Sequence, residues 1–216
     1  MSHLGVMFDL DGTLADTLAD IAAASNFALA ELGHDPLPEH RYRRLAGQGL
    51  AYLVRHALGP THAEQAPEAA RLIKAYHAEH LAHRTRLFPG IGDLLDELAA
   101  RELKLAVLSN KPHDTVCRIA STALSGWPFQ AVQGDEPGKP LKPDPAAALA
   151  IAYELAIPAD HWLYVGDTAA DMLTGTGAGM FTVGVTWGFR DEAELREHGA
   201  DAIIHEPGEL LEHVAR

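Results

Sequence analysis

Acidic, hydroxyl and basic side chains in distant parts of the chain stand where they could take part in one reaction. Asp9, Ser109 and Asp167 each follow a short apolar run that is typical of a buried strand. Functional groups gather at the carboxyl ends of the strands in an open parallel sheet. We therefore expect these three side chains to meet in one crevice, with Asp11 beside Asp9 and with Lys142 just before a predicted helix.

The acidic members of this set predict a metal ion. Three carboxylates in one crevice would repel one another unless a cation neutralised them, and Lys142 alone supplies too little positive charge. Oxygen ligands favour Mg²⁺, which commonly takes one or two carboxylates and leaves positions for water and for substrate phosphate oxygens. An isolated Asp-x-Asp is as often a plain turn, so the expectation depends on the three segments coming together.

Four short motifs stand in order between residues 9 and 171. They are Asp9-Leu10-Asp11-Gly12-Thr13, Ser109-Asn110-Lys111, Lys142-Pro143-Asp144-Pro145 and Gly166-Asp167-Thr168-Ala169-Ala170-Asp171. Together they resemble the four motifs of the haloacid dehalogenase-like hydrolases, within the phosphoglycolate phosphatase-like branch. The first and fourth motifs are specific, whereas the second is short and would be weak alone.

The resemblance implies a Mg²⁺-dependent phosphatase for a small phosphorylated metabolite, with 2-phosphoglycolate as the leading substrate. Asp9 would attack phosphorus and form an aspartyl-phosphate. Asp11 would act first as general acid and then as general base. The implied metal ligands are a side-chain oxygen of Asp9, the backbone carbonyl of Asp11 and the carboxylate of Asp167.

The remaining motif residues would hold the phosphoryl group or support the direct ligands. Ser109, Asn110 and Lys142 are expected to bind the phosphoryl oxygens, and Lys142 would also balance charge. Asp171 would orient Lys142 or a metal-bound water, with Thr13 in the same supporting layer. Lys139-Pro140 could align with the third motif as well, but Lys142 is favoured because Lys-Pro-Asp-Pro directly precedes the predicted helix.

Other reactions of the family fit the residues less well. A dehalogenase lacks the acid that Asp11 provides, and residues 43–49 contain neither the lysine of phosphonate-cleaving relatives nor the pattern of the hexose-phosphate mutases. A phosphatase for nucleoside monophosphates, sugar phosphates or pyrophosphate stays open. A remote alternative is a non-catalytic module that binds a phosphorylated ligand or a protein.

The hydrophobic pattern predicts two parts. After a strand at 4–8, helical periodicity fills the chain to about residue 82, without a strand. From residue 89 onward, helices alternate with short apolar strands, which is typical of a doubly wound α/β fold with a parallel sheet. We therefore expect an α/β core over 1–14 and 87–216, with an all-helical cap inserted over 15–86, where the family's C1-type cap belongs.

Candidates outside the motifs are weaker. Arg44, Gly47 and Gln48 lie in a predicted cap loop. This loop could contact the substrate and contribute to specificity, or it could be a plain turn between helices. The histidines at 77, 80 and 83 are interpreted as one solvated helix face. Arg190 is interpreted as part of a solvent-exposed turn, with a contact to the substrate or to the cap as the alternative.

Composition limits the partners. The 216 residues contain 17 Lys plus Arg and 30 Asp plus Glu, which gives a formal charge of −13. Non-specific electrostatic binding to nucleic acid or to an anionic membrane is therefore not expected. The single cysteine, Cys117, cannot form an intramolecular disulfide. No targeting pattern or membrane span is recognised, which predicts a cytoplasmic protein of undetermined oligomeric state.

Overall fold

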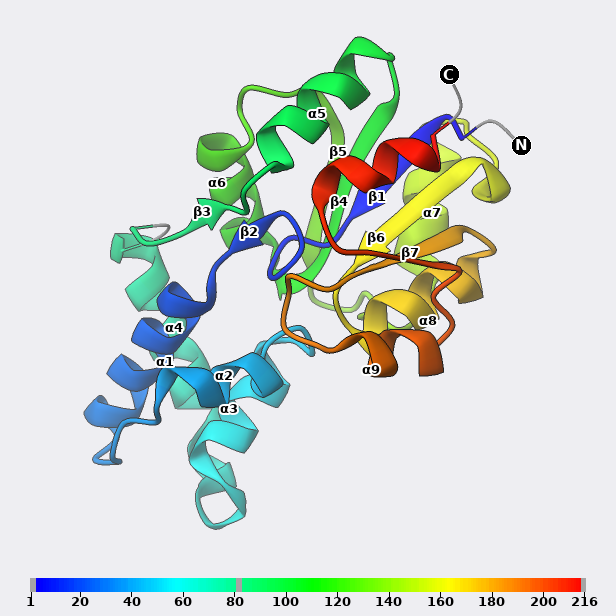
Figure 1. Cartoon of the computed structure of the whole chain (residues 1–216). Coiled ribbons are helices and arrows are strands. Elements are labelled where there is room, and N and C mark those ends of the chain that lie inside the picture. The colour runs from blue at the N-terminus through cyan, green and yellow to red at the C-terminus, as the bar shows by residue number, and fades with distance from the viewer. Residues whose placement is uncertain (1–2, 81–82, 215–216) are drawn as a thin grey trace.

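The computed structural model describes residues 3–80 and 83–214 and shows an α/β architecture (Figure 1). Six parallel strands form one sheet in the order β5-β4-β1-β6-β7-β8. Their bounds are β1 Gly5–Phe8, β4 Lys104–Pro112, β5 Phe129–Asp135, β6 Trp162–Gly166, β7 Phe181–Val185 and β8 Ala202–Ile204. The predicted doubly wound fold is thus confirmed, and the central β1 has β4 and β6 as neighbours.

Helices cover both faces of this sheet because the strand residues are apolar on both sides. Val6 and Phe8 of β1 pack with the buried residues of α5 and α6, whereas Met7 packs with those of α7 and α8. The bounds are α5 Ile91–Ala100, α6 His113–Ala123, α7 Ala146–Glu154, α8 Ala169–Ala178 and α9 Glu192–Glu197, with 3-10 helices η2 Ala159–His161 and η3 Pro207–Glu212. The expected final α-helix is therefore a 3-10 helix.

The chain between β1 and the rest of the sheet forms a second group of helices, drawn in blue to cyan in Figure 1. Its elements are α1 Leu18–Glu31, α2 Glu39–Leu45, α3 Leu50–Leu58, the 3-10 helix η1 Pro60–Gln65 and α4 Ala66–His80. Ile21, Tyr42, Leu53 and Ile73 share an apolar cluster distinct from those of the sheet. One residue from the sheet part, Phe189, joins this cluster and so links the two groups.

A short antiparallel ribbon joins the two parts and was not predicted. β2 Ala15–Asp16 pairs with β3 Arg86–Leu87 where the chain enters and leaves the helices. Nearby, the Asp20 carboxylate accepts hydrogen bonds from the backbone N–H of Thr85 at 2.9 Å and from its hydroxyl at 2.7 Å. These contacts fix the two connections side by side.

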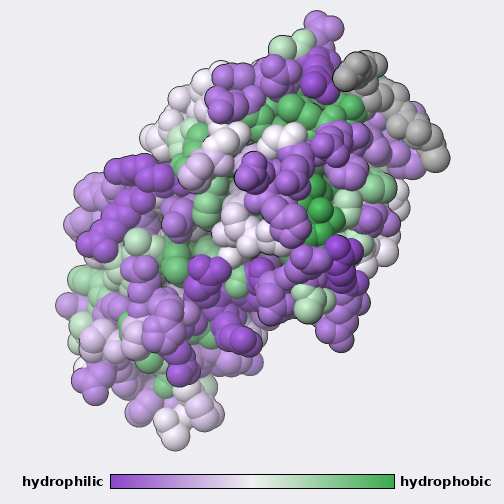
Figure 2. Space-filling view, in the orientation of Figure 1, coloured by the Kyte–Doolittle hydropathy of each residue, from purple (hydrophilic) through white to green (hydrophobic). Residues whose placement is uncertain are grey.

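The outer surface agrees with the composition. Figure 2 shows a face that is largely hydrophilic, with apolar residues in scattered patches. Among the described residues, no helix combines the length and the apolar character needed to cross a membrane.

Candidate active site

The carboxyl edge of the sheet brings three acidic side chains together. Asp9 follows β1, Asp167 follows its neighbour β6, and Asp171 lies in the first turn of α8. All three are buried, and one carboxylate oxygen from each lies within 4.8 Å of the others. The sequence had placed Asp171 in a supporting position, whereas the geometry puts it within reach of the same ion as Asp9 and Asp167.

Lys142 is the cation inside this cluster. Its Nζ lies 3.0 Å from Asp9 Oδ1 and 2.6 Å from Asp171 Oδ1, and it donates a hydrogen bond to the Leu108 carbonyl at 3.1 Å. Its side chain is 2 % exposed. Lys139, the other lysine considered for this position, is exposed and pairs with Glu136.

The electrostatics of the cluster favour an added cation. Burial raises the pKa of Asp9 well above its usual value, against the lowering effect of Lys142, and the nearby carboxylates raise it further. Burial, with the neighbouring Asp171, raises the pKa of Asp167 to about 7. Burial and the crowding of like charges thus disfavour the ionised form of both carboxylates, which a nearby cation would favour. Oxygen-only donors at this spacing therefore fit a hard divalent ion such as Mg²⁺.

Asp167 is fixed in place by groups on both sides. The Thr13 hydroxyl donates to its Oδ1 at 2.9 Å, and the Phe189 backbone N–H donates to its Oδ2 at 2.7 Å. Gly12 and Gly188 allow this approach, because a Cβ at either position would lie 2.3 Å from an atom of the Asp167 side chain. Gly12 also has a φ of +88°, in the left-handed region that favours glycine.

Asp171 is held by the start of its own helix. Thr168 is the N-cap of α8, and its hydroxyl and backbone N–H donate to Asp171 Oδ2 at 2.6 and 3.0 Å. This capping box leaves Asp171 Oδ1 facing Lys142. The expectation that Asp171 orients Lys142 agrees with this geometry.

Asp11 points away from the acidic cluster and has its own partners. Its Oδ1 accepts a hydrogen bond from the Thr17 hydroxyl at 2.6 Å, and Lys111 Nζ lies 2.9 and 3.0 Å from its two oxygens. The side chains of Asp11 and Lys111 are both 8 % exposed. Sequence reasoning gave Lys111 no role, although it completes the second motif, because nothing in the spacing shows which residue it meets.

Asn110 differs from its expected role. Its side-chain amide donates to the carbonyls of Gly47 and Lys142, both at 3.0 Å, and its Oδ1 accepts from the Lys142 backbone N–H at 2.9 Å. The side chain therefore ties the 46–49 loop and the Lys142 segment to β4. Both Ser109 and Asn110 line the cavity described next.

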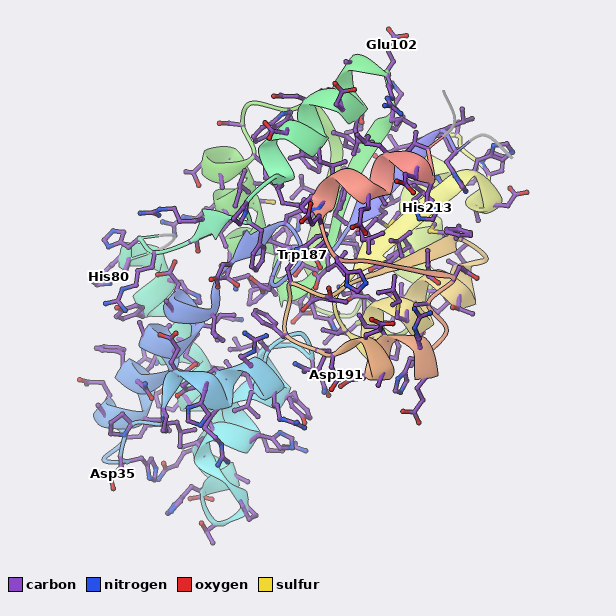
Figure 3. The ribbon with its side chains drawn as sticks, in the orientation of Figure 1. Asp35, His80, Glu102, Trp187, Asp191 and His213 are labelled. Carbon is purple, nitrogen blue, oxygen red and sulfur yellow. The ribbon has the colours of Figure 1, made fainter. Side chains whose placement is uncertain are left out.

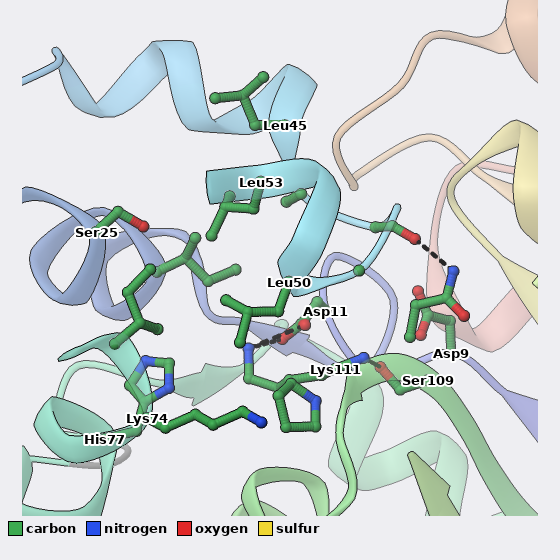
Figure 4. A pocket seen from close by; sticks show the side chains of 17 residues that line it. Asp9, Asp11, Ser25, Leu45, Leu50, Leu53, Lys74, His77, Ser109 and Lys111 are labelled. Carbon is green, nitrogen blue, oxygen red and sulfur yellow. Dashed lines mark hydrogen bonds and ion pairs between the residues drawn. The ribbon is translucent and has the colours of Figure 1, made fainter. Parts of the chain in front are cut away.

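A cavity opens between the helical group and the acidic cluster (Figure 4). Its volume is about 50 Å³, room for a few water-sized groups. The sheet part contributes Asp9, Asp11, Ser109, Asn110, Lys111 and Pro112, and the helical part contributes Ile21, Ser25, Leu45, Ala46, Gly47, Gly49, Leu50, Leu53, Ile73, Lys74 and His77. Of the three loop candidates, only Gly47 lines it; Arg44 and Gln48 are exposed and lie outside the lining.

His77 corrects the interpretation of the histidines as a solvated face. It is 7 % exposed and belongs to the cavity wall. Burial, with the positive charge of Lys111, lowers the pKa of His77 to about 4, so the ring is neutral at pH 7. A signal was present in the sequence: Ala69, Ile73 and His77 recur at four-residue spacing on the buried side of α4.

The loop after β7 contacts the helical group, contrary to the solvent-exposed turn expected for it. The Arg190 guanidinium donates to the carbonyls of Arg43, Arg44 and Ala46 at the end of α2, the last two at 3.2 and 3.1 Å. In the same loop, the Trp187 indole N–H donates to the Thr13 carbonyl at 2.9 Å (Figure 3). One loop thus touches the helices, the first motif and Asp167.

Comparison with known proteins agrees with this geometry. The family model described as haloacid dehalogenase-like hydrolase matches residues 6–185. A phosphoglycolate phosphatase of Pseudomonas fluorescens is 34 % identical over 95 % of this chain and 78 % of its own. A phosphoglycolate phosphatase of Chromobacterium violaceum is 32 % identical over 98 % of this chain and 97 % of its own.

Solved structures show the same architecture. A haloacid dehalogenase-like family hydrolase from Streptococcus pneumoniae superposes with a TM-score of 0.88 at 27 % identity, covering 98 % of each chain. A predicted phosphoglycolate phosphatase from Haemophilus somnus has a TM-score of 0.89 at 25 % identity, covering 99 % of this chain and 98 % of that one. The chain therefore belongs to the haloacid dehalogenase-like hydrolase family, in its phosphoglycolate phosphatase-like branch.

Proposed function

We propose that this chain is a Mg²⁺-dependent phosphatase that hydrolyses a small phosphomonoester through an aspartyl-phosphate on Asp9, with 2-phosphoglycolate as substrate. The observation that carries the proposal is the buried group of Asp9, Asp167 and Asp171 around Lys142, next to a small cavity. The names of the relatives from Pseudomonas and Chromobacterium support the choice of substrate.

Asp9 has the surroundings of an oriented nucleophile. Its Oδ1 accepts a hydrogen bond from the Leu10 N–H at 2.7 Å and lies 3.0 Å from Lys142 Nζ. The hydrogen bonds found within residues 3–80 and 83–214 leave Oδ2 without a donor. Oδ2 is thus the atom that would attack phosphorus, while Lys142 holds the other oxygen and offsets charge on the phosphoryl group.

Asp11 would carry the protons of both half-reactions. When the bond from phosphorus to the ester oxygen breaks, the leaving alkoxide would take the Asp11 proton. In the second half-reaction Asp11 would accept a proton from the water that attacks phosphorus, which releases Asp9 and inorganic phosphate. Thr17 and Lys111 hold the carboxyl between these two steps.

The metal site follows from the same residues. Asp9, Asp167 and the backbone carbonyl of Asp11 would hold Mg²⁺, with Asp171 within reach of the same ion. The ion, when bound, supplies positive charge beside the transferring phosphoryl oxygens. Thr13 and the Phe189 N–H would keep Asp167 in the orientation that binding requires.

The helical group over residues 15–86 would act as a cap. It lines most of the cavity, and it connects to the sheet part through the β2–β3 ribbon. Opening and closing about these connections would admit substrate, exclude bulk water during transfer and then admit the hydrolytic water.

The test is phosphate release from a panel of phosphate compounds. 2-Phosphoglycolate, a hexose phosphate, a nucleoside monophosphate and pyrophosphate would be assayed with Mg²⁺ and with EDTA, using wild-type protein and Asp9→Asn. We expect Mg²⁺-dependent release that is fastest with 2-phosphoglycolate and is abolished in Asp9→Asn. Faster phosphate release from another compound would identify that compound as the better substrate in place of 2-phosphoglycolate. Wild-type turnover by Asp9→Asn would overturn the mechanism.

A further inference from the structure

The cavity next to Asp11 has features that the chemistry at phosphorus does not use. Three basic side chains line it: Lys74 and His77 from α4, and Lys111 from β4 (Figure 4). The cavity also contains Ser25, whose hydroxyl is buried and has no hydrogen-bond partner within the described residues. A buried hydroxyl that lacks a partner is costly in a folded protein, which indicates that a ligand or a bound water completes this wall.

One of the charged residues in the cavity wall has no ion-pair partner within the described residues. Among the acidic groups of the lining, Asp9 is paired with Lys142 and Asp11 with Lys111. Within the part of the chain that the structure describes, Lys74 has no ion pair or hydrogen bond assigned to its amine. Lys74 is therefore the lysine of the lining that has no charged partner in that part of the chain, and its side chain is exposed to solvent at the edge of the cavity.

Lys111 can contact a ligand as well. An ammonium group has three donors, and the contacts to the two oxygens of Asp11 leave one of them for the cavity. His77 is uncharged at neutral pH because burial and Lys111 disfavour its protonated form, and its ring N–H donates to the Asp20 backbone carbonyl. The other ring nitrogen can only accept a hydrogen bond, so His77 belongs to the wall of the cavity but does not bind an anion.

We propose that Lys74 and Lys111 form a subsite for an anionic group on the leaving-group side of the substrate, and that a carboxylate is the group that this subsite binds. This inference rests on the proposed function for the position of the phosphoryl group. Lys74 is a specificity-determining residue in this account, and Ser25 completes its hydrogen bonding through the ligand or one bridging water. The apolar walls from Ile21, Leu53 and Ile73 would strengthen the contact with Lys111, whose side chain is 8 % exposed, by limiting the access of bulk water.

The experiment compares two ligands that differ in the carboxylate alone. Dissociation constants of 2-phosphoglycolate and ethyl phosphate would be measured by calorimetry with Mg²⁺, in an Asp9→Asn background that leaves both ligands intact. Lys74→Met and Lys74→Arg would be added to that background. The matched control is Arg71→Met, one turn earlier on α4, because Arg71 is exposed, pairs with Glu68 and lies outside the cavity.

We expect the preference for 2-phosphoglycolate over ethyl phosphate to fall about tenfold or more in Lys74→Met, as for loss of one charge-assisted hydrogen bond. Lys74→Arg and Arg71→Met should keep the preference. An unchanged preference in Lys74→Met would overturn the subsite. If binding shows the expected pattern and wild-type protein releases no phosphate from either compound, the proposed function fails and the subsite stands.

Discussion

At the scale of single residues, Lys142 determines the charge balance of the candidate site. It lies between Asp9 and Asp171, almost completely buried, and is the third-motif lysine that the sequence favoured. The preference came from a physical cue, the helix start just after Lys-Pro-Asp-Pro. Lys139 is also followed by a proline in the sequence but lies on the surface.

Substitutions of Lys142 and of Lys139 should differ clearly in their effects on activity and stability. Lys142→Met leaves Asp9 and Asp171 buried without their cation, so we expect phosphate release to be lost and the free energy of unfolding to fall by about 3–5 kcal/mol. Lys139→Met removes an exposed pair and should change stability by less than about 0.5 kcal/mol. Phosphate release and urea unfolding would be measured for both variants. Equal effects of the two substitutions would contradict the assignment of Lys142 to the third motif.

The residues that sequence reasoning missed are those whose role depends on a partner from another element. Asp9 and Asp167 could be found because each ends an apolar strand. Lys111 could not be assigned, since it meets Asp11 a hundred residues away. The four-residue spacing of His77 with Ala69 and Ile73 indicates that His77 is buried, but not that it lines a cavity. Asn110 was given a ligand, whereas its amide is used by neighbouring backbone groups.

At the scale of elements, the loop between β7 and α9 couples the helical group to the edge of the sheet that carries Asp167. Arg190 donates to three carbonyls around the end of α2, where an α-helix lacks internal partners for its last carbonyls. The Phe189 N–H holds Asp167 in the same loop. The position of the helices and the orientation of Asp167 therefore depend on one short segment.

Arg190→Ala should loosen this connection. We expect amide hydrogen exchange over residues 39–49 to speed up about tenfold and the KM for substrate to rise, because the closed arrangement loses several charge-assisted hydrogen bonds. Arg196→Ala is the control, since Arg196 forms an exposed pair with Glu192 on α9. Exchange that is the same in Arg190→Ala and wild-type protein would show that this loop does not hold the helices.

The elements themselves were largely predictable. Helical periodicity up to about residue 82 predicted the segment that contains α1 to α4, and the alternation of helices with apolar runs predicted the sheet. The β2–β3 ribbon was missed because two-residue strands carry no periodic signal. The last segment was expected as a helix, but Pro207 and Gly208 open a short 3-10 turn there.

At the scale of the whole molecule, metal binding should be linked to pH and to stability. The pKa of Asp167, raised to about 7 without a metal, means that the folded protein keeps a proton that the unfolded chain loses near pH 4. The stability this group contributes is present below about pH 4 and is lost as the pH rises through about 7. Mg²⁺ must displace that proton, so its affinity should rise with pH up to about 7.

Calorimetric titration with Mg²⁺ between pH 5 and pH 8 measures this linkage. We expect affinity to increase by up to tenfold for each pH unit below about 7 and to level off above it. Urea unfolding at the same pH values should show a larger stabilisation by Mg²⁺ at pH 7 than at pH 5. An affinity that does not change with pH would show that Asp167 is ionised before the metal binds.

The overall architecture could be predicted from the sequence, but the way its two parts contact each other could not. Alternation of helices and strands predicted the parallel sheet, and the resemblance predicted where the helical segment belongs. The contacts of Arg190 and the cavity between α1, α3, α4 and β4 depend on how two separately packed groups meet. No sequence pattern within either group predicts the surface on which the two groups meet.

The most direct test of the proposed chemistry is to locate the phosphoryl group during turnover. Asp11→Asn keeps the nucleophile but removes the base that activates water, so an aspartyl-phosphate should form slowly and persist. The protein would be mixed with Mg²⁺ and 2-phosphoglycolate, digested under acidic conditions and analysed by mass spectrometry. We predict one added phosphoryl group on the peptide that contains Asp9, and none in Asp9→Asn. A phosphoryl group found on another residue would contradict the account.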